Sequence, residues 1–493
     1  MFRNTSVKKA LFLVVALLAV TTVVLAACDG GFTPVSMPAN SDEIVSNGGI
    51  AVQYGEWLYY VNGYTSDVSA DNTYVDVKDA PRIGSVVRIK MTEIEKLFSI
   101  LDDKDLTSTS AKNEKIAKAV RGEVDGISGA ETVVPKIYYS GNTNAGSKQF
   151  NGIYIFDNRI YVTTPNDELT AGGEALTSQL VLTSFKLDGS DMQRHFVFTS
   201  NSAQIWLGKV GDNLVATYIM NNTLYHLDVK SGVSSEVTIN GEDSKPGVAN
   251  TVKSVTWDIA GKNIFFLDKF GSICKLAFGA KNYDVLVKDS KTSVDHGDHL
   301  EDGTITYTIK SVNNGEVYYT IADSTGEKPS DAVIYWASAT SQDNVALKTN
   351  YDSAIGWKQG KMVYSKAEGD FYGIYVVTGD GTGDNKPAVV LSPKHNSSPI
   401  TIDRIEGDVL YYTANSVSYT LDLNGADNSK AGVPFAKSAS STGWSTPDYI
   451  TVGDIHYVIT LGSGTISVVK FDVKEKTNSS SVSLLLTAKP VEE

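Results

Sequence analysis

The stretch of sequence that decides the fold is Gly407-Asp408-Val409-Leu410-Tyr411-Tyr412. A glycine and a polar residue are a turn signal, and the apolar and aromatic residues that follow favour a strand. Comparable stretches begin at positions 55, 157, 211, 261, 315, 360 and 453, and the copy at 157 has Asp157-Asn158 where the others have glycine. From position 211 onward they recur every 45 to 54 residues, which is a period typical of β-propeller blades.

Further short strands flank these copies. Most copies are followed by a second alternating strand, such as Ser418-Tyr419-Thr420-Leu421-Asp422, and three are preceded by a tryptophan, namely Trp206, Trp257 and Trp357. A single four-stranded blade cannot bury both of its faces, but blades packed around an axis can. The pattern therefore predicts an all-β propeller of eight, or alternatively seven, four-stranded blades over residues 48–476.

One segment, residues 91–132, departs from this period. Apolar residues at 94, 97, 98 and 101 have helical spacing, and Ile116, Ala119 and Val120 indicate a second short helix. We expect a small helical insertion within the first blade. It is either a packed decoration or a lid that docks a partner. The C-terminal tail, 477–493, could supply a strand that closes the ring, and so could Ile50-Ala51-Val52.

The N-terminus carries the clearest signal of location. A basic start (Arg3, Lys8, Lys9) precedes an apolar run that ends in Leu25-Ala26-Ala27-Cys28. This order predicts a signal peptide over 1–27, and the alternative is a transmembrane anchor near the lower length limit. Residues 28–47 are rich in Gly, Pro, Ser and Asn, which is typical of a flexible tether.

The last four residues of this run resemble the lipobox of bacterial lipoproteins. The resemblance implies that Cys28 becomes the first residue of the mature protein and carries diacylglycerol and a fatty acid such as palmitate. Two or more acyl chains make a stable anchor where one chain is marginal. We therefore expect the protein in the cell envelope, on the outer side of the cytoplasmic membrane, or in the outer membrane of a Gram-negative cell.

Charge restricts the partners. The net charge of −14 argues against nucleic acid and against electrostatic docking on anionic lipid. Contact with the membrane is therefore expected through the lipid on Cys28.

The repeats also carry a resemblance. Their Tyr-Tyr strands and Leu-Asp turns are similar to the bacterial propeller domain related to the YWTD propellers of low-density-lipoprotein-receptor-related proteins and to the TolB propeller. The resemblance extends over nearly all of 48–475. It implies a propeller on a bacterial surface lipoprotein and says very little about the ligand.

Candidate chemistry is sparse. The densest cluster, which contains Asp295, His296, Asp298 and His299, could bind a divalent metal, although a solvated acidic loop is our preferred interpretation. The chain has no nucleophile elbow, phosphate-binding loop or dinucleotide fingerprint, and none of its six histidines lies near a candidate nucleophile in sequence. We predict no cofactor and no catalytic residue, and the sequence leaves the binding residues unknown.

Two classes of function remain. The preferred hypothesis is a non-enzymatic binding or scaffold module that holds an envelope protein, a peptide or a glycan on one propeller face. The alternative is an extracellular enzyme that acts on glycan or peptide, with its site at the central channel.

Overall fold

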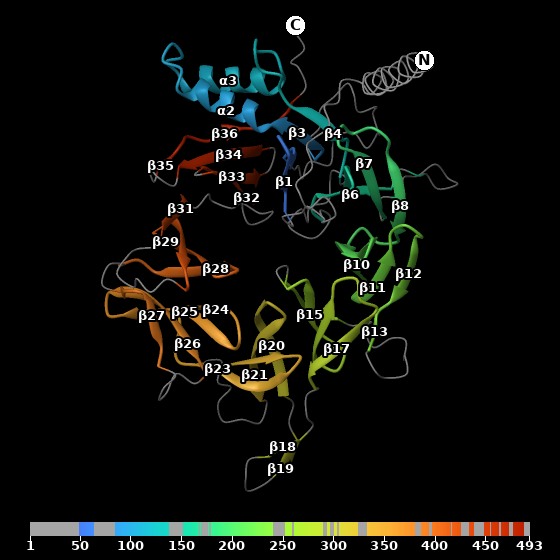
Figure 1. The fold of residues 1–493 in the computed structure, drawn as a ribbon, viewed down its shortest axis with the longest axis vertical. Helices are drawn as coiled ribbons and strands as arrows, with labels where there is room; N and C mark the ends of the chain where they lie inside the picture. Colours follow the sequence, from blue (N-terminus) through green and yellow to red (C-terminus); the bar gives the residue numbers. More distant parts are fainter. Residues whose placement is uncertain are drawn as a thin grey trace, which may run out of the picture.

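The computed structural model is a closed ring of eight antiparallel sheets with two helices at its rim (Figure 1). This confirms the predicted propeller and decides for eight blades rather than seven. The structure describes residues 49–63, 84–137, 151–166, 168, 176, 179–239, 252–258, 261–288, 293–295, 300–302, 305–323, 333–379, 386–393, 397–415, 417–424, 433–437, 448–453, 455–462, 465–472 and 477–487.

The first four blades use strands in chain order. Blade 1 contains β1 (Ala51–Tyr54), β2 (Trp57–Val61), β3 (Val86–Lys90) and β4 (Glu131–Val134). Blade 2 contains β5 (Tyr154–Phe156), β6 (Arg159–Pro165), β7 (Leu180–Lys186) and β8 (Gln193–Phe198). Blade 3 contains β9 (Gln204–Val210), β10 (Asn213–Met220), β11 (Thr223–Asp228) and β12 (Val233–Glu236). Blade 4 contains β14 (Lys253–Asp258), β15 (Asn263–Leu267), β16 (Ile273–Ala277) and β17 (Asn282–Val287), and β13 (Thr238–Ile239) adds to β17 in parallel.

The other four blades follow the same order. Blade 5 contains β20 (Ile305–Asn313), β21 (Glu316–Asp323), β22 (Val333–Ser338) and β23 (Ser341–Lys348). Blade 6 contains β24 (Ser353–Gly356), β25 (Lys361–Glu368), β26 (Phe371–Thr378) and β27 (Ala388–Leu391). Blade 7 contains β28 (Ile400–Glu406), β29 (Val409–Ala414), β30 (Val417–Asp422) and β31 (Val433–Lys437). Blade 8 contains β32 (Asp448–Val452), β33 (Ile455–Gly462), β34 (Thr465–Asp472), β35 (Thr477–Asn478) and β36 (Val482–Ser483).

The turn that opens each repeat depends on positive backbone φ. Gly315 and Gly407 adopt φ of 82° and 60° between the first and second strands of their blades. In blade 2, Asp157 and Asn158 take φ of 47° and 55° instead. Aspartate and asparagine tolerate this left-handed region better than most residues, so the copy without glycine keeps the same hairpin.

The adjacent tyrosines of a repeat pack on opposite faces of its blade. In β21, Tyr318 packs with Met362 and Tyr364 of blade 6, whereas Tyr319 packs with Phe265 of blade 4. Successive side chains of a strand point to opposite faces, so two adjacent aromatic residues fill two interfaces. Both tyrosine side chains are fully buried, at 0% exposure.

Acidic side chains link the turns of successive blades. Gly315 N donates to Asp258 Oδ2 at 2.6 Å, and Gln359 N donates to Glu316 Oε1 at 3.0 Å. Asp408 accepts from Trp357 Nε1 at 3.1 Å and from Lys358 Nζ at 2.5 Å. These contacts join residues 43 to 57 positions apart, so the sequence period is also the spacing of the inter-blade hydrogen bonds.

The two helices lie between β3 and β4, which confirms the expected helical insertion. They are α2 (Met91–Leu101) and α3 (Thr109–Val120). Ile94, Leu97 and Phe98 of α2 are buried in a core shared with blade 8. Glu95 accepts hydrogen bonds from the Tyr457 hydroxyl and from Lys470 Nζ, and both partners belong to blade 8.

The helices therefore join the first blade to the last, at the rim beside β34 and β36 (Figure 1). This position favours the packed-element interpretation of the insertion, and a docking role for the helices stays a prediction. Within the described residues, no helix is long and apolar enough to span a membrane.

The C-terminal segment completes the closure. β36 pairs with β34, and the chain then runs beside blade 1. Tyr60 donates its hydroxyl proton to Leu484 O at 2.7 Å. The Asn62 side chain donates to Leu486 O and accepts from Leu486 N, both at 2.8 Å. Asn62 is fully buried, so these two bonds stabilise the joint between the ends of the chain.

We expect Asn62→Ala to lower the free energy of unfolding by about 1–3 kcal/mol, because the buried N–H and C=O of Leu486 lose their partner. Urea unfolding followed by circular dichroism measures the change. Asn350→Ala removes an exposed asparagine and is the matched control. A loss no larger than that of the control would contradict this role for Asn62.

Candidate functional site

The residues predicted from sequence to carry chemistry fall mainly in parts that are not described. Cys28, His296, Asp298 and His299 lie outside the described residues. Asp295 ends β18 (Ser293–Asp295), which pairs with β19 (Leu300–Asp302) in a hairpin that extends away from the ring (Figure 1). Lipidation and metal binding at these positions stay predictions. Within the described part of the chain, no group of three or more His, Cys, Asp or Glu residues is placed to hold a metal.

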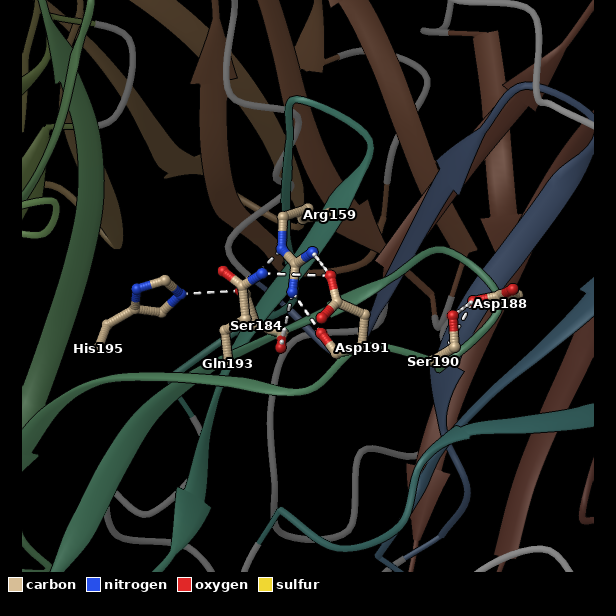
Figure 2. Close-up of polar contacts among 7 residues, drawn as sticks. All are labelled: Arg159, Ser184, Asp188, Ser190, Asp191, Gln193 and His195. Atoms are coloured by element: carbon tan, nitrogen blue, oxygen red, sulfur yellow. Dashed lines mark hydrogen bonds and ion pairs between the residues drawn. The ribbon is translucent and has the colours of Figure 1, made fainter. Parts of the chain in front are cut away.

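A polar cluster in blade 2 brings a serine and a histidine together (Figure 2). Ser184 Oγ of β7 lies 2.8 Å from His195 Nε2 of β8. Arg159 of β6 donates through Nε to the same Ser184 Oγ at 2.9 Å, and through Nη1 to Asp191 Oδ2 at 2.7 Å. Gln193 Nε2 donates to the same Asp191 oxygen at 3.1 Å, so one ion pair ties three strands to their connecting turn.

A β-bulge places His195 in this cluster. The strand register shifts between Leu182 and Thr183, which leaves His195 as the extra residue of β8. Bulges commonly re-aim a side chain, and here the imidazole lies beside the Tyr161 ring at 5.4 Å between centroids. Burial, together with the nearby Arg159 charge, lowers the pKa of His195 below its ordinary value of 6.5. His195 is therefore a neutral imidazole at pH 7.

The contact between Ser184 and His195 is a proximity in space that the sequence did not indicate. The two residues are eleven positions apart and meet only because β7 and β8 pair. Ser184 is fully buried at 0% exposure, and its oxygen already accepts from Arg159. A nucleophile must be reachable by substrate, so this cluster is suited to holding blade 2 together rather than to catalysis.

A second cluster is aromatic and partly exposed. Trp206 of β9, Trp257 of β14 and Phe278, which follows β16, form what we call the aromatic seam between blades 3 and 4. The centroid of the Trp206 ring lies 5.3 Å from that of Trp257 and 5.0 Å from that of Phe278, and the ring planes are inclined by 26° and 29° respectively. Trp257 and Phe278 are 5.8 Å apart. All three side chains are half-buried.

Local structure explains how the seam forms. Ile205 and Leu207 are buried between blades 2 and 3, so Trp206, which lies between them in the strand, faces blade 4. Gly279 adopts φ of 74°, and a Cβ there would come within 2.4 Å of Val210 Cγ2. Its N–H donates to Thr217 Oγ1 at 3.2 Å. Only glycine allows this approach, which brings the preceding Phe278 over Trp206.

The tryptophans that precede three of the repeats, Trp206, Trp257 and Trp357, have different environments. Trp357 is 4% exposed, and its indole N–H donates to Asp408, the residue after the glycine of the next repeat. Within the described residues, neither Trp206 nor Trp257 donates a hydrogen bond from its indole nitrogen.

The offset of each tryptophan from the glycine of its own repeat accounts for the difference. Trp206, Trp257 and Trp357 lie five, four and three residues before that glycine. Adjacent residues of a strand point to opposite faces, so Trp257 packs against blade 3 while Asp258 bonds to the next blade. This offset is the sequence signal that separates the seam from Trp357. The signal for Phe278 is the glycine that follows it.

Comparisons with known proteins identify only distant similarities, among solved structures. No protein-family model matches the chain, and no curated protein matches it. Among solved structures, the chain is similar to a nidogen/laminin complex at 12% identity and a TM-score of 0.26, with 57% of this chain and 92% of that chain covered.

Two further solved structures show a similar level of likeness. YCF48 bound to D1 peptide is 11% identical at a TM-score of 0.31, covering 61% of this chain and 86% of that chain. An uncharacterized protein from Listeria monocytogenes EGD-e is 10% identical at 0.32, covering 65% and 90%. Similarity at this level does not extend to ligand or activity.

We expect the free energy of unfolding to rise with pH between about pH 5 and 7, in part because of His195. A histidine with a lowered folded pKa binds more protons when unfolded, so acid favours the unfolded chain over this interval. His195→Gln should make the pH dependence shallower, as measured by urea unfolding at several pH values. Ser190→Ala, in the exposed turn nearby, is the control. An unchanged slope in His195→Gln would show that His195 does not titrate as expected.

Proposed function

We propose that this protein is a lipid-anchored, extracytoplasmic binding or scaffold module that holds its ligand at the aromatic seam. The observation that carries the proposal is the partly exposed seam, with two indole N–H groups that have no partner in the described residues. Buried tryptophans usually have their N–H paired, and a ring that is apolar on its face and polar at one edge is common at interfaces.

The anchor is supported by the order of the N-terminal residues. A basic start, an apolar run and Leu25-Ala26-Ala27-Cys28 precede a tether that is rich in small and polar residues. The propeller is acidic as a whole, so attachment to an anionic membrane surface depends on lipid rather than on charge. The Tyr-Tyr strands and Leu-Asp turns support membership of the lipoprotein family with YWTD- and TolB-like propellers.

The environments of Ser184 and of the aromatic seam support binding over catalysis. The hydrogen-bonded serine and histidine do not favour the enzymatic alternative, because Ser184 is fully buried and bonded to Arg159. The three side chains of the seam, in contrast, are partly exposed, and β9 and β14 hold its two indoles in place. Rigid aromatic side chains lose little conformational entropy when they bind, which makes them effective anchors for a ligand.

Replacing the predicted lipid-bearing residue tests the anchor. Cys28→Ala should abolish incorporation of an alkyne-labelled palmitate and move the protein out of the membrane fraction, because the acyl chains have no other attachment site. Cys274→Ala is the control, since Cys274 is fully buried in blade 4 and should leave labelling unchanged. Palmitate labelling that persists in Cys28→Ala would refute lipidation at this residue.

Substituting the two tryptophans of the aromatic seam tests whether the ligand binds there. In intact cells, cross-linking should join the wild-type protein to an envelope component that the double variant Trp206→Ala/Trp257→Ala no longer captures. Trp357→Phe, which loses the bond to Asp408, should keep the capture and instead lower the unfolding temperature. If the double variant folds and captures the same component as the wild type, the seam is not the binding site.

A further inference from the structure

We propose that His226 is a pH-sensitive switch of the aromatic seam, because a proton on its imidazole separates blade 4 from blade 3 beside Phe278. The switch rests on the proposed function, since it regulates the same site. Three observations support it. The imidazole is buried without a partner for Nδ1 among the described residues, its neighbours across the sheet are uncharged, and a hydrogen bond from the turn after Phe278 ends beside it.

His226 lies in β11 and faces blade 4. Leu224, two residues earlier on the same face of the strand, is buried in a core that it shares with Ile264 and Phe266 of blade 4. The His226 side chain is 6% exposed, and within the described residues its Nδ1 is buried without a hydrogen-bond partner. A buried polar atom without a partner costs free energy, and a charge at the same place costs much more.

Blade 3 gives a protonated His226 little compensation. The residues opposite His226 on the adjacent strands are Thr217 of β10 and Ser235 of β12, and neither carries a charge. The acid on the same face of β11 is Asp228, whose Oδ1 already accepts from Ser231 N at 2.8 Å and from Ser231 Oγ at 2.9 Å. An imidazolium at this position would therefore be poorly neutralised.

Blade 4 places a cation near the same imidazole. Lys281 lies in the turn between β16 and β17, and the other titratable groups in the shared core, Cys274 and Tyr283, are neutral. Burial and the Lys281 charge lower the pKa of His226 below its ordinary value of 6.5, against the weaker opposing effect of Asp228. Protonation is therefore unfavourable while the blades are packed, and it becomes favourable once the imidazole reaches water.

The turn that faces His226 also carries part of the seam. Gly279 N of this turn donates to Thr217 Oγ1 at 3.2 Å, and Thr217 is the cross-strand neighbour of His226. Phe278 precedes Gly279, and its ring lies 5.0 Å from that of Trp206. Moving the turn away from Thr217 gives a charged His226 access to water and takes Phe278 off Trp206, so one movement relieves the charge and opens the seam.

The direction of the switch follows from the two protonation states. At pH 7 His226 is neutral and the seam is closed. Below the ordinary histidine pKa of 6.5 the open form binds a proton that the closed form does not. The open population then rises by up to about tenfold per pH unit, until the closed form also becomes protonated.

Hydrogen exchange at the Gly279 amide measures this opening, because that N–H is the donor to Thr217. The experiment uses the full-length protein in detergent and corrects each rate for the intrinsic pH dependence of exchange. Between about pH 6.5 and pH 5.5 we expect protection at Gly279 to fall about threefold to tenfold. The amides of β25 in blade 6 serve as the reference for global unfolding and should change less.

Matched variants assign the response to His226. His226→Gln removes the titrating group and should make protection at Gly279 independent of pH over this interval. His456→Gln, in blade 8, is the control and should keep the response of the wild type. If His226→Gln does not fold, the exposed Lys281→Gln removes the repelling cation and should make the fall smaller. A wild type without the fall, or a fall that neither His226→Gln nor Lys281→Gln reduces, would overturn the switch.

Cross-linking at two pH values separates the switch from the proposed function. The wild type should capture less of its envelope component at about pH 5.5 than at about pH 7.5, and His226→Gln should capture equally at both. If capture needs Trp206 and Trp257 but does not depend on pH, the switch is overturned and the binding module stands. If capture does not need the two tryptophans, the binding module fails, and exchange at Gly279 alone decides whether His226 opens the seam.

Discussion

The structure depends on one constraint, which is that no blade can bury both of its faces alone. Each sheet becomes stable only when its two neighbours cover it, and the adjacent tyrosines of β21 show this at the level of single residues. Tyr318 fills the interface with blade 6, and Tyr319 fills the interface with blade 4. Because every blade needs two neighbours, the ring must close, and the first and last blades need a joint of their own. The chain provides it with α2, α3 and the segment around Leu484.

The same constraint determines where a site can form. Most repeat positions are used by inter-blade packing, as Trp357 is when its indole bonds to Asp408 of the next blade. A partly exposed ring arises where a tryptophan lies off the position that bonds to the next blade. In blade 3 Gly208 stands at that position, three residues before Gly211, and Trp206 lies two residues earlier. The seam is thus a local departure from a structural pattern, and such departures are expected at functional positions.

Much of the fold could be predicted because the signals are local. Gly407 and Asp408 specify a turn, the residues after them specify a strand, and their recurrence specifies blades. The helical spacing of Ile94, Leu97 and Phe98 likewise identified an insertion. The joining of blades 1 and 8 by that insertion could not be predicted, because Glu95 meets Lys470 across 375 positions of sequence. The contact of Ser184 with His195 was also missed, since it depends on a bulge in β8.

The sequence by itself determined the repeat, the strand and turn chemistry, the helical segment, and hence a propeller, because each follows from the backbone preferences of neighbouring residues. Only the tertiary structure decided the blade count, the closure and the different environments of Trp206, Trp257 and Trp357. These depend on what the adjacent blade places against a residue about fifty positions away, such as Asp408 against Trp357. All three tryptophans stand a few residues before the glycine of a repeat, and only the strand pairing decides which neighbouring blade each of them contacts.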